Sequence, residues 1–233
     1  QTRATLGGVM DGRPYFITVD EARTICQHTP PPLRTEHRPI ELCTGRVLAE
    51  DLASMVNDPP FDNSAMDGFA CRFDETASYP CTLTVVGLQA ASGENEFVEV
   101  GPGEAVRIMT GAPMPPGADA ILPIERCDVG DGTVVLLEPP KPHFVRKLGE
   151  NLKQGTVALT KGQRLTPARI GLCATMGYAS VPVFQQLNIA IVSTGDELKS
   201  PGEALAHGEI YESNSYGLPG LVEWEGHTAV RFP

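Results

Sequence analysis

Pro60-Phe61-Asp62-Asn63-Ser64-Ala65-Met66-Asp67-Gly68-Phe69-Ala70 is the stretch around which this chain is organised, because it gathers oxygen-bearing side chains in one short segment. Asp, Asn and Ser hydrogen-bond their own backbone and favour turns over regular ladders. Pro59 and Pro60 hold the chain before the turn extended. The residues alone leave two interpretations open. One is a surface turn with solvated carboxylates. The other is a preorganised loop that handles protons or a hard cation such as Mg²⁺.

The composition indicates an ordinary soluble globular protein. The 233 residues allow one or two domains, and 41% of them are hydrophobic. The 21 prolines and 24 glycines are spread along the chain, which predicts many turns and short strands rather than disorder. The net charge of -11 argues against nucleic-acid binding. An anionic substrate would therefore need local Arg or Lys, backbone N–H groups or bound Mg²⁺.

The cysteines and histidines give no metal-binding pattern. The six cysteines contain no C-x-x-C pair, so they argue against zinc and predict scattered reduced thiols in a cytoplasmic protein. The five histidines are isolated, and we assign them no metal. No apolar stretch is long enough to cross a membrane, and the first ten residues lack a signal-peptide core.

The first half of the chain passes from a helix into a run of strands. Thr18 and Glu21 form a capping box that predicts a helix, and Pro30 ends it. Residues 40–43 are interpreted as a short strand and residues 45–52 as a short helix. Alternation and turn residues then predict a compact all-β module. Its strands are expected at residues 83–86, 97–100, 105–108, 120–123 and 133–137.

The last third of the chain predicts the beginning of an α/β layer. Thr166 and Pro167 begin a helix that Gly177 stops. Residues 187–192 form a continuous apolar run that is typical of a buried parallel strand. Ser213-Asn214 is expected to cap a helix that contains Pro219, and residues 228–230 to form the next strand. Two strands bury little, so we expect this segment to pack poorly by itself.

Three motifs in order carry a resemblance to a known family. They are residues 62–70, Arg107-Ile108-Met109-Thr110-Gly111-Ala112-Pro113 and Ser193-Thr194-Gly195-Asp196-Glu197-Leu198. Together they resemble the signatures of the molybdopterin molybdotransferase family, which comprises MoeA and the E domain of gephyrin. The resemblance extends from about Thr18 to the end of the chain and corresponds to the N-terminal and central part of the family.

The resemblance implies a multidomain α+β protein. Residues 1–51 and 148–180 would form a linker and dimerisation domain, and residues 52–147 a mostly-β inserted module. Residues 181–233 would begin a Rossmann-like α/β molybdopterin-binding domain. We expect this third domain to continue beyond residue 233, so the chain is interpreted as cut or incompletely recorded.

The resemblance also assigns site residues. The expected catalytic residues are Asp67, Ser64, Thr110 and Glu197. The expected substrate-binding residues are Arg107, Gly111, Thr194, Gly195 and Asn151. The expected metal ligands are Asp196, Glu197 and Asp67. For each position the alternative is a plain turn, strand-face or solvated-loop residue.

Two of these positions raise specific expectations. Placing molybdenum on a dithiolene requires an oxo group to leave as water, so we expect a proton-handling carboxylate with a raised pKa, and Asp67 is the candidate. At Asn151 the family usually carries Asp, in a Gly-Glu-Asp run. Asn keeps an acceptor oxygen but loses charge and basicity, so this chain is expected to be slow or inactive if that position needs a carboxylate.

The function that the resemblance implies is a transferase of molybdenum cofactor biosynthesis. It would insert molybdate into adenylylated molybdopterin and release AMP with Mg²⁺. It would act as a cytoplasmic homodimer whose active site spans the interface, with other molybdenum-cofactor enzymes as further partners. The alternatives are a gephyrin-like scaffold or binding module, an inactive fragment, and another protein of the wider molybdopterin-binding fold. The first two motifs argue against the last, because they lie in the β module that such proteins lack.

Overall fold

The computed structural model describes residues 9–10, 13–14, 17–73, 78–92 and 98–232. The chain divides into two compact units. Unit 1 comprises Gln1–Glu36 and Phe184–Pro233, and unit 2 comprises His37–Val183. Among the described residues, no helix has the length and apolar character needed to cross a bilayer.

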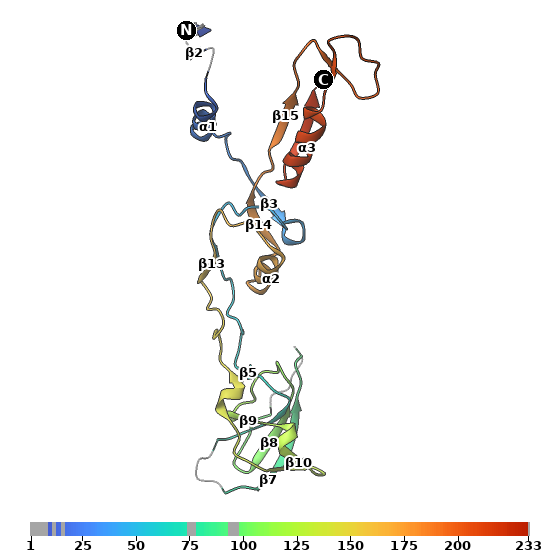
Figure 1. Ribbon diagram of the computed structural model, residues 1–233. Coiled ribbons are helices and arrows are strands. Elements are labelled where there is room, and N and C mark those ends of the chain that lie inside the picture. Colours follow the sequence, from blue (N-terminus) through green and yellow to red (C-terminus); the bar gives the residue numbers. More distant parts are fainter. Residues whose placement is uncertain (1–8, 11–12, 15–16, 74–77, 93–97, 233) are drawn as a thin grey trace. The chain divides into compact units, whose positions relative to one another are not determined.

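The main element of unit 2 is a six-stranded sheet with the order β10-β11-β7-β8-β6-β9. Figure 1 labels β7, β8, β9 and β10 of this sheet. Its pairs are antiparallel except for β7 with β8, which is parallel. The strands are β6 (Gly68–Cys71), β7 (Cys81–Gln89), β8 (Glu104–Ile108), β9 (Ala120–Pro123), β10 (Cys127–Val129) and β11 (Thr133–Leu136). The predicted strands at 83–86, 105–108, 120–123 and 133–137 are therefore confirmed.

Strand β6 was not predicted, because the oxygen-rich turn before it dominates that part of the sequence. All of its residues are buried, and it lies between β8 and β9. Phe69 and Cys71 pack in one apolar cluster, and Ala70 packs in another. This alternation is the two-residue period of a strand with both faces covered. The pairing fixes the position of the turn that precedes β6.

The remainder of unit 2 consists of short paired segments, one helix and 3₁₀ turns. Helix α2 (Pro167–Thr175) begins at the Thr166 cap as predicted, and Gly177 has a φ of 93°. The apolar core beside this helix contains Leu48, Leu165 and Met176. The short elements are β3 (Thr35–Pro39) with β14 (Ser180–Phe184), β4 (Leu52–Ala53) with β13 (Val157–Leu159), β5 (Asn63–Ser64) with β12 (Val145–Arg146), η1 (Ile40–Leu42), η2 (Ile124–Arg126) and η3 (Pro142–Phe144).

Three sequence-based expectations are corrected in unit 2. Residues 40–42 form a 3₁₀ turn instead of a strand, because the Cys43 N–H bonds back to the Ile40 carbonyl. Residues 45–52 are not helical, because distant backbone takes their hydrogen bonds. The Leu48 N–H, for example, donates to the Gln163 carbonyl at 2.9 Å. Of the strand predicted at 97–100, Phe97 lies outside the described residues and residues 98–100 are not in a strand.

Unit 1 contains the predicted βα unit. Strands β15 (Asn188–Val192) and β18 (Thr228–Phe232) are parallel neighbours. Helix α3 (Asn214–Trp224), which contains Pro219, lies between them in the chain. In β15 only Ile191 is buried, so the expected buried strand is largely exposed, as two strands by themselves would be. The unit also contains β1 (Val9–Met10), β2 (Arg13–Pro14), β16 (Leu198–Lys199) and β17 (Ile210–Tyr211).

Helix α1 (Val19–His28), also in unit 1, confirms the capping box. The Thr18 hydroxyl accepts the Glu21 N–H at 3.2 Å, and the Glu21 carboxylate accepts the Thr18 N–H at 2.7 Å. None of its side chains is buried, and Val19 and Ile25 expose 70% and 53% of their surface. The helix therefore forms from local signals and presents an uncovered apolar face.

Candidate functional site

The pairing of β6 with β8 brings the first two motifs together. Gly68 lies opposite Ile108, so Asp67 before β6 meets the turn after β8. Thr110 donates two hydrogen bonds to one oxygen of Asp67, at 2.6 Å from its N–H and 2.7 Å from its hydroxyl. The other carboxylate oxygen has no hydrogen bond among the described residues. Asp67 is exposed, so this oxygen faces solvent and can accept a proton or bind a ligand.

The electrostatics of Asp67 overturn one expectation. The hydrogen bonds from the Thr110 N–H and hydroxyl, with a smaller contribution from the Arg107 charge, hold the pKa of Asp67 below its usual range. Donors directed at a carboxylate favour its charged form. Our prediction of a raised pKa is therefore wrong. Near neutral pH, Asp67 is therefore ionised.

Ser64 and Gly111 support this turn with groups that were predicted to face a substrate. The Ser64 side chain is fully buried, and its hydroxyl bonds to the Met66 carbonyl at 2.5 Å. The Gly111 N–H donates to the Ser64 carbonyl at 2.8 Å. Both donors are occupied, so in this structure neither is available to an oxyanion. The side chain of Arg107 is exposed on β8, close enough to Asp67 to lower its pKa.

The first motif is anchored at its other end by Asp62. The Lys147 ammonium bonds to one Asp62 oxygen at 2.9 Å, and the Leu148 N–H bonds to the other at 2.8 Å. These contacts, led by Lys147, lower the pKa of Asp62. Lys147 thus holds the turn in place. The sequence contained no local signal for this pairing because the two residues are 85 positions apart.

Asn151 lies beside Asp58 at the same side of the module. Its side-chain amide donates to an Asp58 oxygen at 3.2 Å, and its N–H donates to the Asp58 carbonyl at 3.0 Å. The uncharged Asn151 amide therefore donates a hydrogen bond to the Asp58 carboxylate without neutralising its charge. A carboxylate at position 151 would place two like charges side by side and would raise one of the two pKa values.

The third motif lies in unit 1, at the carboxyl end of β15. A small cavity of about 160 Å³ opens there, with Gly195 in its wall. Thr194, Asp196 and Glu197 are exposed and do not line it. The polar lining comes mostly from residues that the sequence did not single out. These are Lys199, Ser200, Glu212, Ser215 and Arg231, and Ser193 of the third motif lies with them.

A network around Glu212 organises this cavity. The carboxylate is 9% exposed and accepts hydrogen bonds from the Ser193 hydroxyl at 2.9 Å and from the N–H and hydroxyl of Ser215. Arg231 donates to the Ser215 hydroxyl at 2.6 Å and lies over the Tyr216 ring. The Ser215 side chain and N–H, then the Ser193 hydroxyl and the Arg231 charge, lower the pKa of Glu212. The network ties β15, α3 and β18 together.

Glu212 also corrects the predicted helix cap. Helix α3 begins where expected, but the Ser213 side chain makes no capping hydrogen bond. The Glu212 carboxylate accepts the Ser215 N–H instead, at 2.6 Å. An acidic residue suits the positive end of a helix, and Glu just before the Ser-Asn pair was the available signal.

We expect Glu212→Gln to loosen the start of α3, because the amide cannot accept both Ser215 donors and loses the attraction to Arg231. Hydrogen exchange of the Ser215 N–H should accelerate, and the melting temperature should fall. Glu209→Gln is the matched control, because Glu209 is another acid of this unit that accepts a backbone N–H, from Ala206 at 2.7 Å. Equal exchange at Ser215 in both variants would show that the network does not stabilise the helix.

A complete protein-borne metal site does not occur in the described residues. No three His, Cys, Asp or Glu side chains converge there. Of the predicted ligands, Asp67 belongs to unit 2, whereas Asp196 and Glu197 are consecutive in unit 1. Mg²⁺ is usually held by one or two carboxylates together with substrate phosphates and water. Asp196 and Glu197 are both exposed, so their carboxylates are accessible to an ion.

Comparisons with known proteins agree on one family. The family profile described as the MoeA N-terminal region (domain I and II) matches residues 17–177. The molybdopterin molybdenumtransferase of Haemophilus influenzae is 41% identical over 212 residues, which are 89% of this chain and 52% of the relative. Molybdopterin molybdenumtransferase 2 of Mycobacterium tuberculosis is 40% identical over 197 residues, which are 82% of this chain and 48% of the relative.

Solved structures give the same result. A crystal structure of the molybdopterin biosynthesis MoeA protein from Pyrococcus horikoshii has a TM-score of 0.79 and 33% identity, and covers 92% of this chain and 56% of that one. A second structure of that protein has a TM-score of 0.76 and 32% identity, and covers 86% and 54%. This chain spans about half the length of the curated relatives that it matches.

Proposed function

This chain belongs to the MoeA family, as the match over residues 17–177 shows, and we propose that it serves in molybdenum cofactor biosynthesis as part of a molybdopterin molybdenumtransferase. The observation that carries the proposal is the contact between its first two family motifs. The Asp67 carboxylate is held by Thr110 through two hydrogen bonds and lies near the Arg107 charge. A carboxylate fixed in this way beside a cation is a group prepared for chemistry on an oxyanion substrate.

The proposed substrates are molybdate and adenylylated molybdopterin. Water cleaves the phosphoanhydride bond of the adenylylated molybdopterin, so that AMP leaves as the second product and the terminal phosphate stays on the molybdopterin. When a dithiol displaces one oxo group of molybdate, its two S–H protons leave with that oxygen as water. Asp67 is ionised, so it takes a sulfhydryl proton and passes it to the departing oxygen. Arg107 attracts the molybdate anion to this position despite the net charge of -11. In this scheme Asp67 acts as a base, as its lowered pKa requires.

The cavity of unit 1 is the proposed position of the phosphate groups. Lys199 and Arg231 provide cations in its lining, and Gly195 lets a phosphate approach the backbone. Asp196 and Glu197 follow directly and would share a Mg²⁺ ion with those phosphates, which neutralises charge between them. This arrangement replaces Thr194 by Lys199 and Arg231 as the main phosphate contacts.

We further propose that the protein works as a cytoplasmic homodimer, with Asp67 of one subunit facing the third motif of the other. The uncovered apolar face of α1 supports an association, since Val19 and Ile25 are more than half exposed. Delivery of the product to molybdenum-cofactor enzymes would follow from the same function.

A chimera tests the proposed function. This chain replaces the matching half of the Haemophilus influenzae relative, and the hybrid is expressed in a bacterium that lacks its own molybdopterin molybdenumtransferase. We expect the chimera to restore molybdoenzyme activity in the cells and molybdate-dependent AMP release in vitro. A chimera that unfolds cooperatively on heating, and is therefore folded, but gives neither activity would contradict the proposal.

A further inference from the structure

A second cavity lies in the β module, at the opposite end of the strands that hold Asp67. It has a volume of about 370 Å³, within the range of small-molecule sites. Cys71 at the end of β6 and Glu104 at the start of β8 line it. Asp67 precedes the other end of β6, about 13 Å away along the strand. The cavity is therefore separate from the proposed active site.

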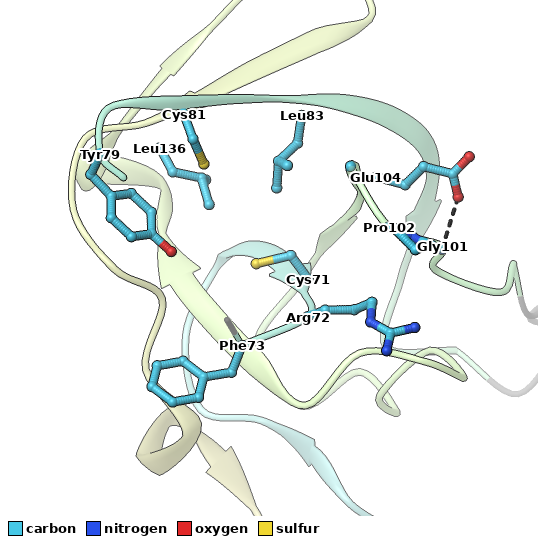
Figure 2. Close-up of a pocket in the computed structure, with 11 residues that line it drawn as sticks. Cys71, Arg72, Phe73, Tyr79, Cys81, Leu83, Gly101, Pro102, Glu104 and Leu136 are labelled. Carbon is cyan, nitrogen blue, oxygen red and sulfur yellow. Dashed lines mark hydrogen bonds between the residues drawn. The ribbon is translucent and has the colours of Figure 1, made fainter. Parts of the chain in front are cut away.

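One wall of this cavity is apolar. Figure 2 shows Cys81, Leu83 and Leu136 facing Cys71 across the space, with the Tyr79 ring at one side. Leu136 and Cys71 are buried. Burial raises the pKa of the Cys71 thiol to about 12 and also raises that of Cys81, so both thiols are neutral. This wall suits the uncharged body of a ligand.

The two charged side chains of the lining, Glu104 and Arg72, lie at one side of the cavity, and they differ in their contacts. The Glu104 carboxylate accepts the Gly101 N–H at 2.9 Å (Figure 2). Arg72 is exposed, and it makes no hydrogen bond or ion pair with any other described residue. A guanidinium fork beside an apolar wall matches a carboxylate or a similar oxyanion.

We propose that this cavity binds a small amphipathic organic anion, with its apolar body against Leu83 and Leu136 and its anionic group on Arg72. The ligand class is an aromatic or short aliphatic acid. The cavity volume excludes large ligands, and the neutral thiols keep their part of the wall uncharged, while the Glu104 carboxylate lies on the same side as Arg72. Neither the active-site motifs nor the unit 1 cavity takes part.

The test uses 2-naphthoate as the probe and 2-naphthylmethanol as its uncharged counterpart. Occupancy is read from the alkylation rate of Cys81 by iodoacetamide, measured by peptide mass spectrometry. The exposed Cys26 on α1 is the internal reference. We expect naphthoate to slow alkylation of Cys81 severalfold at saturation and to leave Cys26 unchanged. Calorimetric titration gives the dissociation constant on the same sample.

Two variants distinguish a specific charge interaction of the probe with Arg72 from non-specific binding. Arg72→Gln should weaken naphthoate about fivefold and leave naphthylmethanol unchanged. Arg126→Gln, which removes another exposed Arg of the module, should change neither constant. The proposal is overturned if millimolar naphthoate leaves Cys81 alkylation unaltered, or if Arg72→Gln and Arg126→Gln weaken naphthoate equally. All of these experiments measure binding of the probe, so their results do not depend on transferase activity.

Discussion

Asp67→Asn in the chimera should lower the rate of molybdate-dependent AMP release by about 10²- to 10⁴-fold, the usual loss when a positioned proton-transfer group is removed. The amide retains the shape of the side chain and can still accept the Thr110 hydrogen bonds. It cannot take a proton at any ordinary pH. The loss should therefore appear in kcat, with little change in the KM for molybdate. Single-turnover AMP release by quenched flow is the measurement.

The controls for this variant come from the same sheet. Asp128→Asn removes an exposed carboxylate from β10 and should leave the rate within about twofold, because surface charges have small effects. Thr110→Val removes one of the two donors that lower the pKa of Asp67. The pKa of Asp67 should therefore rise in this variant, and the acid limb of the variant's pH–rate profile should lie at higher pH than that of the wild type. An Asp67→Asn enzyme with a normal rate would exclude this residue from the chemistry.

Mixed dimers show whether the site crosses a subunit interface. Asp67→Asn and Glu197→Gln should each be inactive as pure dimers. After random mixing, half of the dimers carry one of each, and one of their two sites is intact, so about a quarter of the wild-type rate should return. No recovery, in samples shown to exchange subunits, would place both residues in a site within one chain.

The sequence revealed the parts of this protein that depend on local signals. The capping box at Thr18 and the Thr166-Pro167 helix start act within a few residues and were predicted correctly. The apolar run at 187–192 was correct as a parallel strand but not as a buried one. Strand β6 was missed because its four buried residues follow a turn-rich segment and acquire their conformation from β8 and β9. Its pattern has meaning only in the context of those neighbours.

The candidate site shows the same division. Family motifs identified Asp67 and Thr110, but not that Thr110 would lower the pKa of Asp67, because that requires both side chains in one place. The donors expected from Ser64 and Gly111 are used within the turn. Glu212 and Arg231 were not recognised as members of one network. Arg231 lies 19 positions after Glu212 in the chain, with α3 between them. Chemistry that arises from packing was therefore beyond a linear analysis.

The second substitution with a large expected effect is at Gly68. This residue directly follows Asp67 but serves packing and not catalysis. A Cβ at this position would overlap the carbonyl oxygen of Leu122 in β9 and lie 2.9 Å from its carbonyl carbon. These are backbone atoms in a paired strand, so no side-chain rotation relieves the overlap. Either β6 or β9 must shift, and each contributes buried residues to the core of the sheet.

We therefore expect Gly68→Ala to lower the free energy of unfolding of unit 2 by about 3 kcal/mol or more, at the upper end of overpacking effects. Gly171→Ala is the matched control. Gly171 lies in α2 with open space around its missing Cβ, so the same substitution should stabilise that helix by about 0.5–1 kcal/mol. Urea denaturation followed by circular dichroism measures both. If Gly68→Ala unfolds at the wild-type urea midpoint, the close approach of β6 and β9 is not required for the fold, and the glycine must be explained by the chemistry of Asp67 beside it.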